Sequence, residues 1–392
     1  MVNKEEINNL LSRGVENIFP NREFLEAKLN KKEKLTIYLG IDPTGKNLHL
    51  GHIIPLRKLS EFQKLGHQII LLIGDFTARI GDPTDKTATR KKLTTEQVAE
   101  NLKEYKKQVS KFISFSGENK ALLKFNSKWL AKRTFEEIIE LTSLITVDQM
   151  LKRDMFVRRM EENKPIYIHE FLYPVMQGYD SVAMDVDGEV GGNDQTFNML
   201  VGRDFMKKIK NKEKFVIATK LLTDPEGKKM GKTEDNMVSL DQGPDDIFGK
   251  IMSWNDNLIM PGFELCTDIN TEEVLRINNP KEQKILLAKE IVSMIHNKAK
   301  ANKAQKNFEN TFKKGAVPDN IIEISLSSGE ELKNHIVNSK IVSSNTDWKR
   351  LIEENAVSIV GTEEIIKDPY IKADKDVVLR IGKKRFVKII VK

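Results

Sequence analysis

The chain has 392 residues, of which 39% are hydrophobic and 31% are charged, and its net charge is +7. This composition excludes a disordered chain and favours a globular protein of two or three domains, while the mild positive charge permits a polyanionic partner without demanding one. Because Cys266 is the single cysteine, an intrachain disulfide framework and a cysteine-based zinc site are both excluded.

No segment of the sequence predicts export or insertion into a membrane. The N-terminal stretch MVNKEEINNLLSRGVENIF is charged and amphipathic, and it lacks the apolar core of a signal peptide. The longest apolar run, Ile69–Gly74, is far too short to cross a bilayer. We therefore expect a cytoplasmic protein without a membrane partner.

Strand and helix patterns alternate along the first half of the chain. Leu35–Ile41 predicts a strand that ends at the breaker cluster Asp42-Pro43-Thr44-Gly45, and apolar side chains three apart predict a helix over His52–Leu65. The apolar stretch His67–Gly74 predicts a buried strand before a second breaker, Gly81-Asp82-Pro83. The later predictions are a helix over Glu96–Ile113, a strand over Ala121–Phe125, helices between Phe135 and Met160 and over Ile168–Tyr179, and a strand over Phe215–Thr219.

This order of elements predicts an α/β fold in which helices cover a Rossmann-like parallel sheet. Ligands of such sheets bind beyond the carboxyl ends of the strands, where the loops at Asp42 and Asp82 would lie. Polar helical segments follow from about residue 240 to 320, and short strand-like pieces return after Ile321. We therefore expect a Rossmann-like domain (1–236), a helical domain (237–321) and a small α+β tail (322–392).

A first candidate motif, His49-Leu50-Gly51-His52, lies between a strand-ending loop and a helix. Its two histidines lie on one side of the first helical turn, where free backbone N–H groups and the helix dipole favour phosphate. Gly51 has no side chain, so a flat base or a ribose could approach the backbone closely. The alternative is chance, since the pattern is short.

A second candidate motif is Lys228-Lys229-Met230-Gly231-Lys232-Thr233. Lysines three apart around a glycine form a cationic loop that suits the polyphosphate of a nucleotide. A solvated surface loop is the commoner use of such a run. The spacing is not that of a Walker A loop.

Together, in this order and within a βαβ chain, the two motifs resemble the H-x-G-H and K-M-S-K-S signatures of class I aminoacyl-tRNA synthetases. Gly231 departs from the serine of the second signature, although the lysines and the hydroxyl of Thr233 are kept. Across nearly its whole length the chain resembles bacterial tyrosyl-tRNA synthetases. The motifs that carry this resemblance are Tyr38–Thr44, Gly81–Thr84 with Lys86 and Arg90, the Y-x-x-x-Q-x-x-D pattern of Tyr173, Gln177 and Asp180, and Gly191–Gln195.

The resemblance implies a tyrosine–tRNA ligase that activates L-tyrosine with ATP and then loads it onto the 3′ end of tRNA(Tyr). The tyrosine-binding residues that it implies are Tyr38, Asp82, Tyr173, Gln177, Asp180 and Gln195. Tyr38 and Asp180 would supply the donor and the acceptor that a phenolic hydroxyl needs. Tyr173, Gln177 and Asp180 fall on one helix face, and a face that only packs in the core would hardly use such polar residues.

The resemblance also implies residues for ATP and for the transition state, which needs positioning and charge stabilisation but no covalent enzyme intermediate. The implied ATP-binding residues are Gly40, Asp42, His49, Gly51, His52, Gly192, Asp194 and Lys232. The implied catalytic residues are Thr44, His49, His52, Lys86, Arg90, Lys229, Lys232 and Thr233. Mg²⁺ would accompany ATP, with no dedicated carboxylate cage in the protein.

The tail from about residue 322 resembles the S4-like RNA-binding module that closes many bacterial relatives. Its cations Lys383, Lys384 and Arg385 stand beside Phe386, a combination that RNA backbone and bases can use. An exposed basic hairpin without RNA is the alternative. The resemblance further implies a homodimer.

Three rival functions stay open on the sequence alone. A tryptophan enzyme of related architecture must hold an indole, and Tyr38 with Asp180 argues against it. A non-catalytic RNA-binding paralogue would be favoured by lost lysines or histidines, and these residues are present. A nucleotidyltransferase of the same fold that acts on a small metabolite would not need the basic tail.

Overall fold

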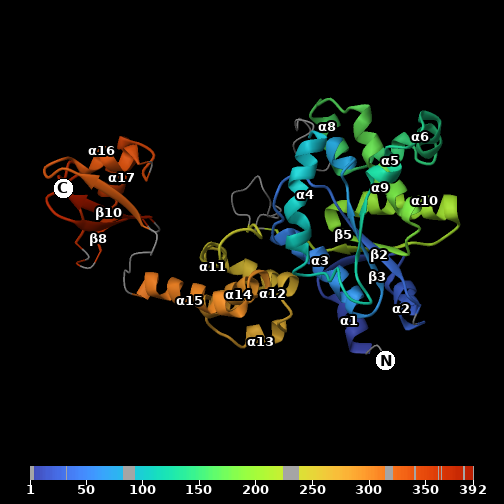
Figure 1. Cartoon of the computed structure of the whole chain (residues 1–392), viewed down its shortest axis with the longest axis horizontal. Helices are drawn as coiled ribbons and strands as arrows, with labels where there is room; N and C mark the ends of the chain where they lie inside the picture. The colour runs from blue at the N-terminus through green and yellow to red at the C-terminus, as the bar shows by residue number, and fades with distance from the viewer. Residues whose placement is uncertain are drawn as a thin grey trace. The chain divides into compact units, whose positions relative to one another are not determined.

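The computed structural model consists of two compact units, Met1–Asn297 and Lys298–Lys392 (Figure 1). It describes residues 4–31, 33–82, 93–223, 238–313, 321–339, 341–360, 362, 364–382 and 385–391. The division of function into three parts at 236 and 321 stays a prediction.

A six-stranded sheet forms the centre of the first unit, in the order β1-β6-β5-β2-β3-β4. Its strands are β1 (Val15–Phe19), β2 (Thr36–Ile41), β3 (Gln68–Ile73), β4 (Leu122–Phe125), β5 (Gly188–Gly192) and β6 (Phe215–Thr219). Neighbouring strands are parallel except at the edge, where β1 runs antiparallel to β6. The predicted Rossmann-like α/β fold is confirmed, while β1 and β5 are strands that the sequence patterns did not predict.

Helices lie on both sides of this sheet, and this explains why every residue of β6 is buried (Figure 1). α3 (Leu50–Lys64) packs against β2, β3 and β5, whereas α10 (Thr196–Lys210) packs against β5, β6 and α9 (Ile168–Met184). α9 runs beyond the predicted end at Tyr179 and stops where Asp185 takes the left-handed conformation. The other helices before β6 are α1 (Lys4–Ser12), α2 (Arg22–Asn30), η1 (Thr77–Arg79), α4 (Thr95–Val109), α5 (Ser127–Leu130), α6 (Phe135–Thr142), α7 (Val147–Leu151), α8 (Asp154–Glu161) and η2 (Asn193–Gln195).

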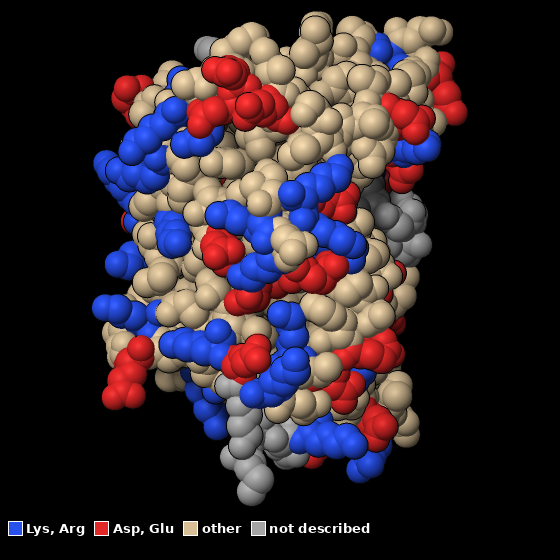
Figure 2. Space-filling model, turned by 90° about the vertical axis from the view of Figure 1, so that its right-hand side faces the viewer, with Lys and Arg blue, Asp and Glu red and all other residues tan. Residues whose placement is uncertain are grey.

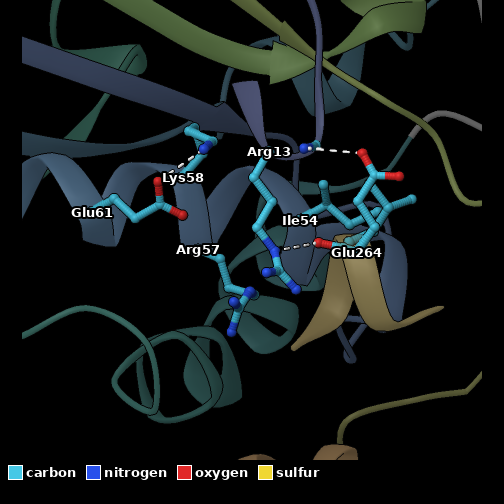
Figure 3. A pocket seen from close by; sticks show the side chains of 8 residues that line it. Arg13, Ile54, Arg57, Lys58, Glu61 and Glu264 are labelled. Carbon is cyan, nitrogen blue, oxygen red and sulfur yellow. Dashed lines mark hydrogen bonds and ion pairs between the residues drawn. The ribbon is translucent and has the colours of Figure 1, made fainter. Parts of the chain in front are cut away.

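A helical segment follows the sheet within the same unit, as the sequence predicted. Its helices are α11 (Pro244–Met252), η4 (Asp256–Leu258), α12 (Ile259–Cys266), α13 (Thr271–Leu275) and α14 (Pro280–Ile295). Arg13 joins this segment to the N-terminal part, because its guanidinium donates to the carbonyls of Phe263, Glu264, Thr267 and Ile269. Figure 3 shows the contact with Glu264. Carbonyls at a helix end lack partners within the helix, so the half-buried guanidinium of Arg13 caps α12.

A small hollow beside Arg13 lies between α3 and α12 (Figure 3). Its charged side chains already have partners: Lys58 pairs with Glu61, and Glu264 accepts from Lys220. No residue that the sequence predicts for tyrosine, ATP or RNA lines it. We therefore regard this hollow as part of the scaffold.

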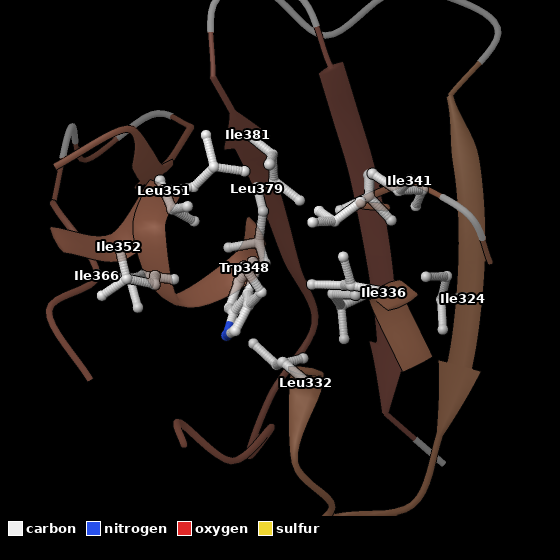
Figure 4. Close-up of a cluster of buried hydrophobic side chains, with 14 of the residues drawn as sticks. Ile324, Leu332, Ile336, Ile341, Trp348, Leu351, Ile352, Ile366, Leu379 and Ile381 are labelled. Carbon is white, nitrogen blue, oxygen red and sulfur yellow. The ribbon is translucent and has the colours of Figure 1, made fainter. Parts of the chain in front are cut away.

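The second unit begins with α15 (Lys298–Lys313) and contains a four-stranded sheet in the order β7-β10-β9-β8. The remaining elements are β7 (Ile322–Leu326), α16 (Leu332–Asn338), α17 (Asn345–Glu353), β8 (Val357–Ile359), β9 (Val377–Ile381) and β10 (Arg385–Val391). Trp348 of α17 is fully buried in a core that the two helices share with the sheet (Figure 4). The predicted α+β tail is confirmed and has a hydrophobic core of its own.

Candidate active site

The strands β2 and β5 bring the predicted site residues to one end of the sheet, at the carboxyl ends of the strands. β2 and β5 are parallel neighbours although they are distant in chain order. α/β sheets bind ligands at such a topological switch point, where the strand order reverses, beyond the carboxyl ends of the strands. β2 leads directly into Asp42 and β5 ends at Gly192, just before Asp194. The loop at Asp42 and the Gly191–Gln195 motif therefore lie at the same end of the sheet.

Tyr38 and Asp180, the residues predicted to hold a phenol, are both buried. The Tyr38 hydroxyl lies 3.0 Å from Ser181 Oγ, while Asp180 accepts hydrogen bonds from Trp129 Nε1 at 2.7 Å and Asn126 Nδ2 at 3.2 Å. Burial raises the pKa of Tyr38 well above its usual value, so the phenol stays protonated and can donate. Burial also raises the pKa of Asp180, and the two N–H donors act in the opposite direction by stabilising its carboxylate.

A chain of hydrogen bonds joins Tyr173 to the loop after β2. Tyr173 donates to Asp42 Oδ2 at 2.9 Å, and Thr77 Oγ1 donates to Asp42 Oδ1 at 2.7 Å. A Cβ at Gly74 would lie 1.8 Å from Asp42 Oδ1, so only glycine allows this approach. Asp42, predicted for ATP, and Tyr173, predicted for tyrosine, thus belong to one network.

Two further predicted residues, Gln195 and Gln177, each bond to a carboxylate. Gln195 Nε2 donates to Asp82 Oδ2 at 2.7 Å, and Asn198 Nδ2 donates to Gln195 Oε1 at 2.9 Å. Gln177 Nε2 donates to Glu189 Oε1 at 3.3 Å. These partners fix the orientation of both amides.

The H-x-G-H motif forms the N-terminus of α3. His49 is the N-cap and accepts from the backbone N–H of Gly51, while His52 Nδ1 accepts from the backbone N–H of His49. A Cβ at Gly51 would lie 3.1 Å from the His49 ring, which explains the glycine. The Leu50 N–H donates to Val238 O at 2.9 Å, so the chain that follows the Lys-rich motif returns to the start of this helix.

Several predicted site residues have no described side chain. Lys86, Arg90, Lys229, Lys232, Thr233, Lys383 and Lys384 lie outside the described residues. Of the remainder, Gly40 is exposed in β2, the Thr44 N–H donates to the Asp42 carbonyl, and Arg385 donates to the carbonyl of Ile341.

Among the helices that the structure describes, none combines the length and apolar character that a bilayer requires.

Sequence reasoning missed several residues that support the predicted ones. Asn126 and Trp129 both donate to Asp180; Asn126 follows β4 directly and Trp129 lies in α5 just after it, so their place after a strand was a usable signal. Glu189 is a carboxylate inside a buried strand, which is also a signal because such a group needs a partner. That partner, Lys214, looks in the sequence like any lysine of a Lys-rich stretch.

Comparisons with known proteins identify the family of the chain. The family model described as "tRNA synthetases class I (W and Y)" matches residues 30–313. The chain is 42% identical to the tyrosine–tRNA ligase of Desulfotalea psychrophila, over 100% of this chain and 99% of that protein. It is also 42% identical to tyrosine–tRNA ligase 2 of Vibrio cholerae, over 97% of this chain and 98% of that protein.

Solved structures of similar fold point the same way. A C-terminally truncated mitochondrial tyrosyl-tRNA synthetase from Coccidioides posadasii is 26% identical with a TM-score of 0.64, covering 78% of this chain and 92% of its own. Tyrosyl-tRNA synthetase from Archaeoglobus fulgidus, solved with L-tyrosine, has a TM-score of 0.61 at 22% identity, covering 77% of this chain and 98% of its own. The second likeness concerns the fold alone.

Proposed function

The chain belongs to the class I tRNA synthetases for tryptophan and tyrosine, and on this premise we propose which residues carry out each step of its reaction. Its activity is that of a tyrosine–tRNA ligase, since relatives of that name match it over almost its whole length. ATP is a substrate of this family. The observation that carries the choice of tyrosine within the site is the burial of Tyr38 and Asp180.

Tyrosine is proposed to bind with its hydroxyl between Tyr38 and Asp180. Tyr38 would donate to the phenolic oxygen and Asp180 would accept the phenolic proton. Trp129 and Asn126 support this role, because they hold both oxygens of Asp180. Tyrosine would satisfy these groups, whereas phenylalanine would leave them buried without a partner.

The other end of tyrosine is proposed to lie near Asp82, Tyr173 and Gln177, which would accept from its ammonium group. Gln195 would stand near the reacting carboxylate, held by its bond to Asp82. This division is supported by the Tyr173–Asp42 contact, because Asp42 begins the loop proposed for ATP. The same hydrogen-bond network would therefore contact both substrates.

ATP is proposed to bind across the start of α3, at His49, Gly51 and His52, with Gly192 and Asp194 at the ribose. A carboxylate oxygen of tyrosine attacks the α-phosphorus, the bond to the bridging oxygen breaks, and pyrophosphate leaves. Cations proposed to surround the phosphates are Lys86, Arg90, Lys229 and Lys232, together with the hydroxyls of Thr44 and Thr233. A terminal tRNA hydroxyl then attacks the tyrosyl carbonyl and AMP leaves. Positioning and charge stabilisation account for both steps.

Mg²⁺ is proposed to arrive with the ATP phosphates. In the described part of the chain, no group of three or more His, Cys, Asp or Glu side chains is arranged to hold a metal ion. Mg²⁺ retains several waters and commonly binds through substrate phosphates, so a protein cage is not required. No step above is assigned to the ion.

The tail is proposed to bind tRNA(Tyr). It carries the predicted residues Lys383, Lys384 and Arg385, and two further lysines, Lys333 and Lys349, lie beside Tyr370. Lys333 Nζ lies 4.6 Å and Lys349 Nζ 5.2 Å from the centre of this exposed ring. Cations beside an aromatic ring suit RNA phosphates and bases.

A homodimer is proposed to form through an apolar surface on the first unit. We give the name α6–α9 patch to the exposed large apolar side chains of α6, α7 and the start of α9, which are Phe135, Ile139, Val147, Tyr167 and Ile168. Phe135 is 81% and Ile168 80% exposed, and α6 buries none of its residues within one chain. Figure 2 shows broad uncharged areas between the charged side chains in the upper part of one face, at the height of α6 in Figure 1. A second copy that covers such a patch would remove it from water.

Exchange of labelled pyrophosphate into ATP tests the proposed function. We expect tyrosine to drive this exchange efficiently and the other nineteen amino acids to fail. Comparable exchange with tryptophan or phenylalanine would contradict the proposed roles of Tyr38 and Asp180. The assay should use the full-length chain at physiological ionic strength. These conditions resemble the cytoplasm, where we propose that the enzyme works.

A further inference from the structure

A buried ion pair, Glu189 with Lys214, lies behind the proposed tyrosine site and takes no part in the steps above. Lys214 is fully buried and Glu189 is only 2% exposed. Apolar side chains of the same volume often stabilise a fold as well as a buried ion pair does. Stability alone therefore does not explain why two opposite charges occupy this position.

Hydrogen bonds connect the pair to both ends of the proposed pocket. Glu189 accepts from Gln177 Nε2 at 3.3 Å and, through its other oxygen, from Lys214 Nζ. Lys214 also donates to Ser181 Oγ at 2.8 Å, and Ser181 Oγ lies 3.0 Å from the Tyr38 hydroxyl. Tyr38 and Glu189 are register partners on β2 and β5, which puts their side chains on the same face of the sheet.

The packing around the pair is built to allow these contacts. A Cβ at Gly202 of α10 would lie 2.7 Å from both Lys214 Nζ and Ser181 Oγ. Glycine at this position therefore lets the ammonium reach the serine. Lys214 Nζ also lies 5.6 Å from the centre of the Tyr38 ring, so the cation is next to the phenol that it influences.

The chemistry of the pair sets the direction of the hydrogen bonds. A carboxylate only accepts, so Glu189 accepts from Nε2 of Gln177. The amide oxygen Oε1 of Gln177 can then accept from another donor, such as an ammonium group. A lysine ammonium only donates, so Lys214 occupies one acceptor position of Ser181 and favours the arrangement in which the serine hydroxyl donates to Tyr38. Tyr38 then keeps its own proton to donate elsewhere.

We propose that Glu189 and Lys214 are positioning residues that determine amino-acid selectivity, because they set Gln177 to accept the substrate ammonium and Tyr38 to donate to the phenolic oxygen. This inference rests on the proposed tyrosine site. Asp180 then accepts the proton of the substrate hydroxyl. The pocket floor thus offers one donor and one acceptor, which is the pair that a phenol requires and a phenyl ring cannot use.

Two double variants of the full-length enzyme test this role. Glu189→Gln with Lys214→Met keeps the volume but removes the obligatory acceptor and the obligatory donor. Glu189→Lys with Lys214→Glu keeps an ion pair but reverses every hydrogen bond that leaves it. Arg203→Met with Glu213→Gln is the matched control, since it removes a neighbouring ion pair that has no hydrogen bond to the pocket residues within the described part of the chain.

The readouts are the KM for tyrosine, the KM for ATP, the ratio of kcat/KM for tyrosine over phenylalanine in pyrophosphate exchange, and the thermal midpoint. We expect the neutral pair to fold, to raise the KM for tyrosine about tenfold and to lower the ratio by about 10- to 100-fold, with the KM for ATP unchanged. The reversed pair should lose more selectivity than the neutral pair, and the control should match the wild type.

A merely structural role gives a different result. It would lower the thermal midpoint while leaving the tyrosine KM and the selectivity ratio of the folded enzyme at wild-type values, and that outcome overturns the inference. If the reversed pair does not fold, the volume-matched neutral pair decides the question alone. Failure of the wild-type enzyme to exchange with tyrosine would instead overturn the proposed site itself, so the two failures are distinguishable.

Discussion

The phenol of Tyr38 combines full burial with a hydrogen bond to Ser181, and these two facts determine what it can do at the residue scale. Burial raises its pKa, so it stays a donor throughout the physiological pH range. A buried donor left without a partner is unfavourable by about 1–3 kcal/mol, which is how a pocket rejects a ligand that lacks the matching hydroxyl.

Replacing Tyr38 with Phe should lower kcat/KM for tyrosine about tenfold while leaving the value for phenylalanine almost unchanged. The reason is that one neutral hydrogen bond to the substrate hydroxyl is lost, and phenylalanine never forms it. Pyrophosphate exchange with both amino acids measures the effect. Tyr179→Phe on the same helix as Asp180 is the control and should behave like the wild type; equal losses for both amino acids would remove Tyr38 from hydroxyl recognition.

At the scale of elements, the turn after β3 controls the loop after β2. Gly74 follows β3 directly, and its missing side chain makes room for the Asp42 carboxylate. Asp42 in turn accepts from Thr77 in η1 and from Tyr173 in α9. One glycine thus lets three elements and one loop meet at the candidate active site.

Gly74→Ala should disturb this meeting point more than a surface change would. The new Cβ would lie 1.8 Å from Asp42 Oδ1 and 2.4 Å from Thr77 Oγ1, so Asp42 must move and its hydrogen bonds must break. We expect a loss of about 1–3 kcal/mol in the free energy of unfolding and a higher KM for tyrosine. Denaturant unfolding and exchange kinetics measure both.

Gly249→Ala is the control for this substitution. Gly249 lies within α11 and has no heavy atom within 4 Å of an added Cβ, so alanine there should be neutral or slightly stabilising. Wild-type stability and wild-type KM in Gly74→Ala would show that the Asp42 network tolerates the extra methyl group.

At the scale of the whole molecule, two surfaces support proposals that concern regions outside the pocket. The α6–α9 patch is apolar and exposed on the first unit, whereas the second unit has its own core and carries exposed cations such as Lys349. A homodimer and a tRNA contact are the two proposals that these surfaces support.

The double variant Phe135→Asp with Ile168→Asp should convert the proposed dimer into a folded monomer. Two carboxylates placed in a buried apolar interface would each require costly desolvation. Sedimentation measures the mass in solution. Leu275→Asp, on an exposed apolar residue of α13 outside the patch, should leave the dimer intact. A dimer that survives the double variant would move the interface away from α6 and α9.

Deletion of residues 321–392 should spare tyrosine-dependent exchange but strongly impair transfer of tyrosine to tRNA. Every residue proposed for tyrosine and ATP lies between Tyr38 and Thr233, whereas the tail contributes cations. Phosphate contacts weaken as salt rises, so full-length tRNA binding should fall steeply with salt and the truncated enzyme should show a shallower slope. Aminoacylation that survives the deletion intact would make the tail ordinary surface.

The sequence by itself determined the class of fold and predicted which residues form the site, because both depend on local patterns. Apolar runs and breakers predicted β2, α3 and β3, and short motifs picked out Tyr38, Asp180 and the histidines of α3. The sequence patterns did not predict β1 and β5, since Val15–Phe19 mixes polar with apolar residues and Gly188–Gly192 is rich in glycine.

Only the tertiary structure decided which side chains support these residues. Lys214 bonds to Ser181 and Glu189 across 33 and 25 residues of sequence, and Arg13 caps a helix about 250 residues away. Such partners leave no periodic trace in the sequence, since a lysine before a strand reads the same whether it is solvated or buried. The free energy of burying a charge distinguishes these cases, and it depends on neighbours that only the folded chain brings together.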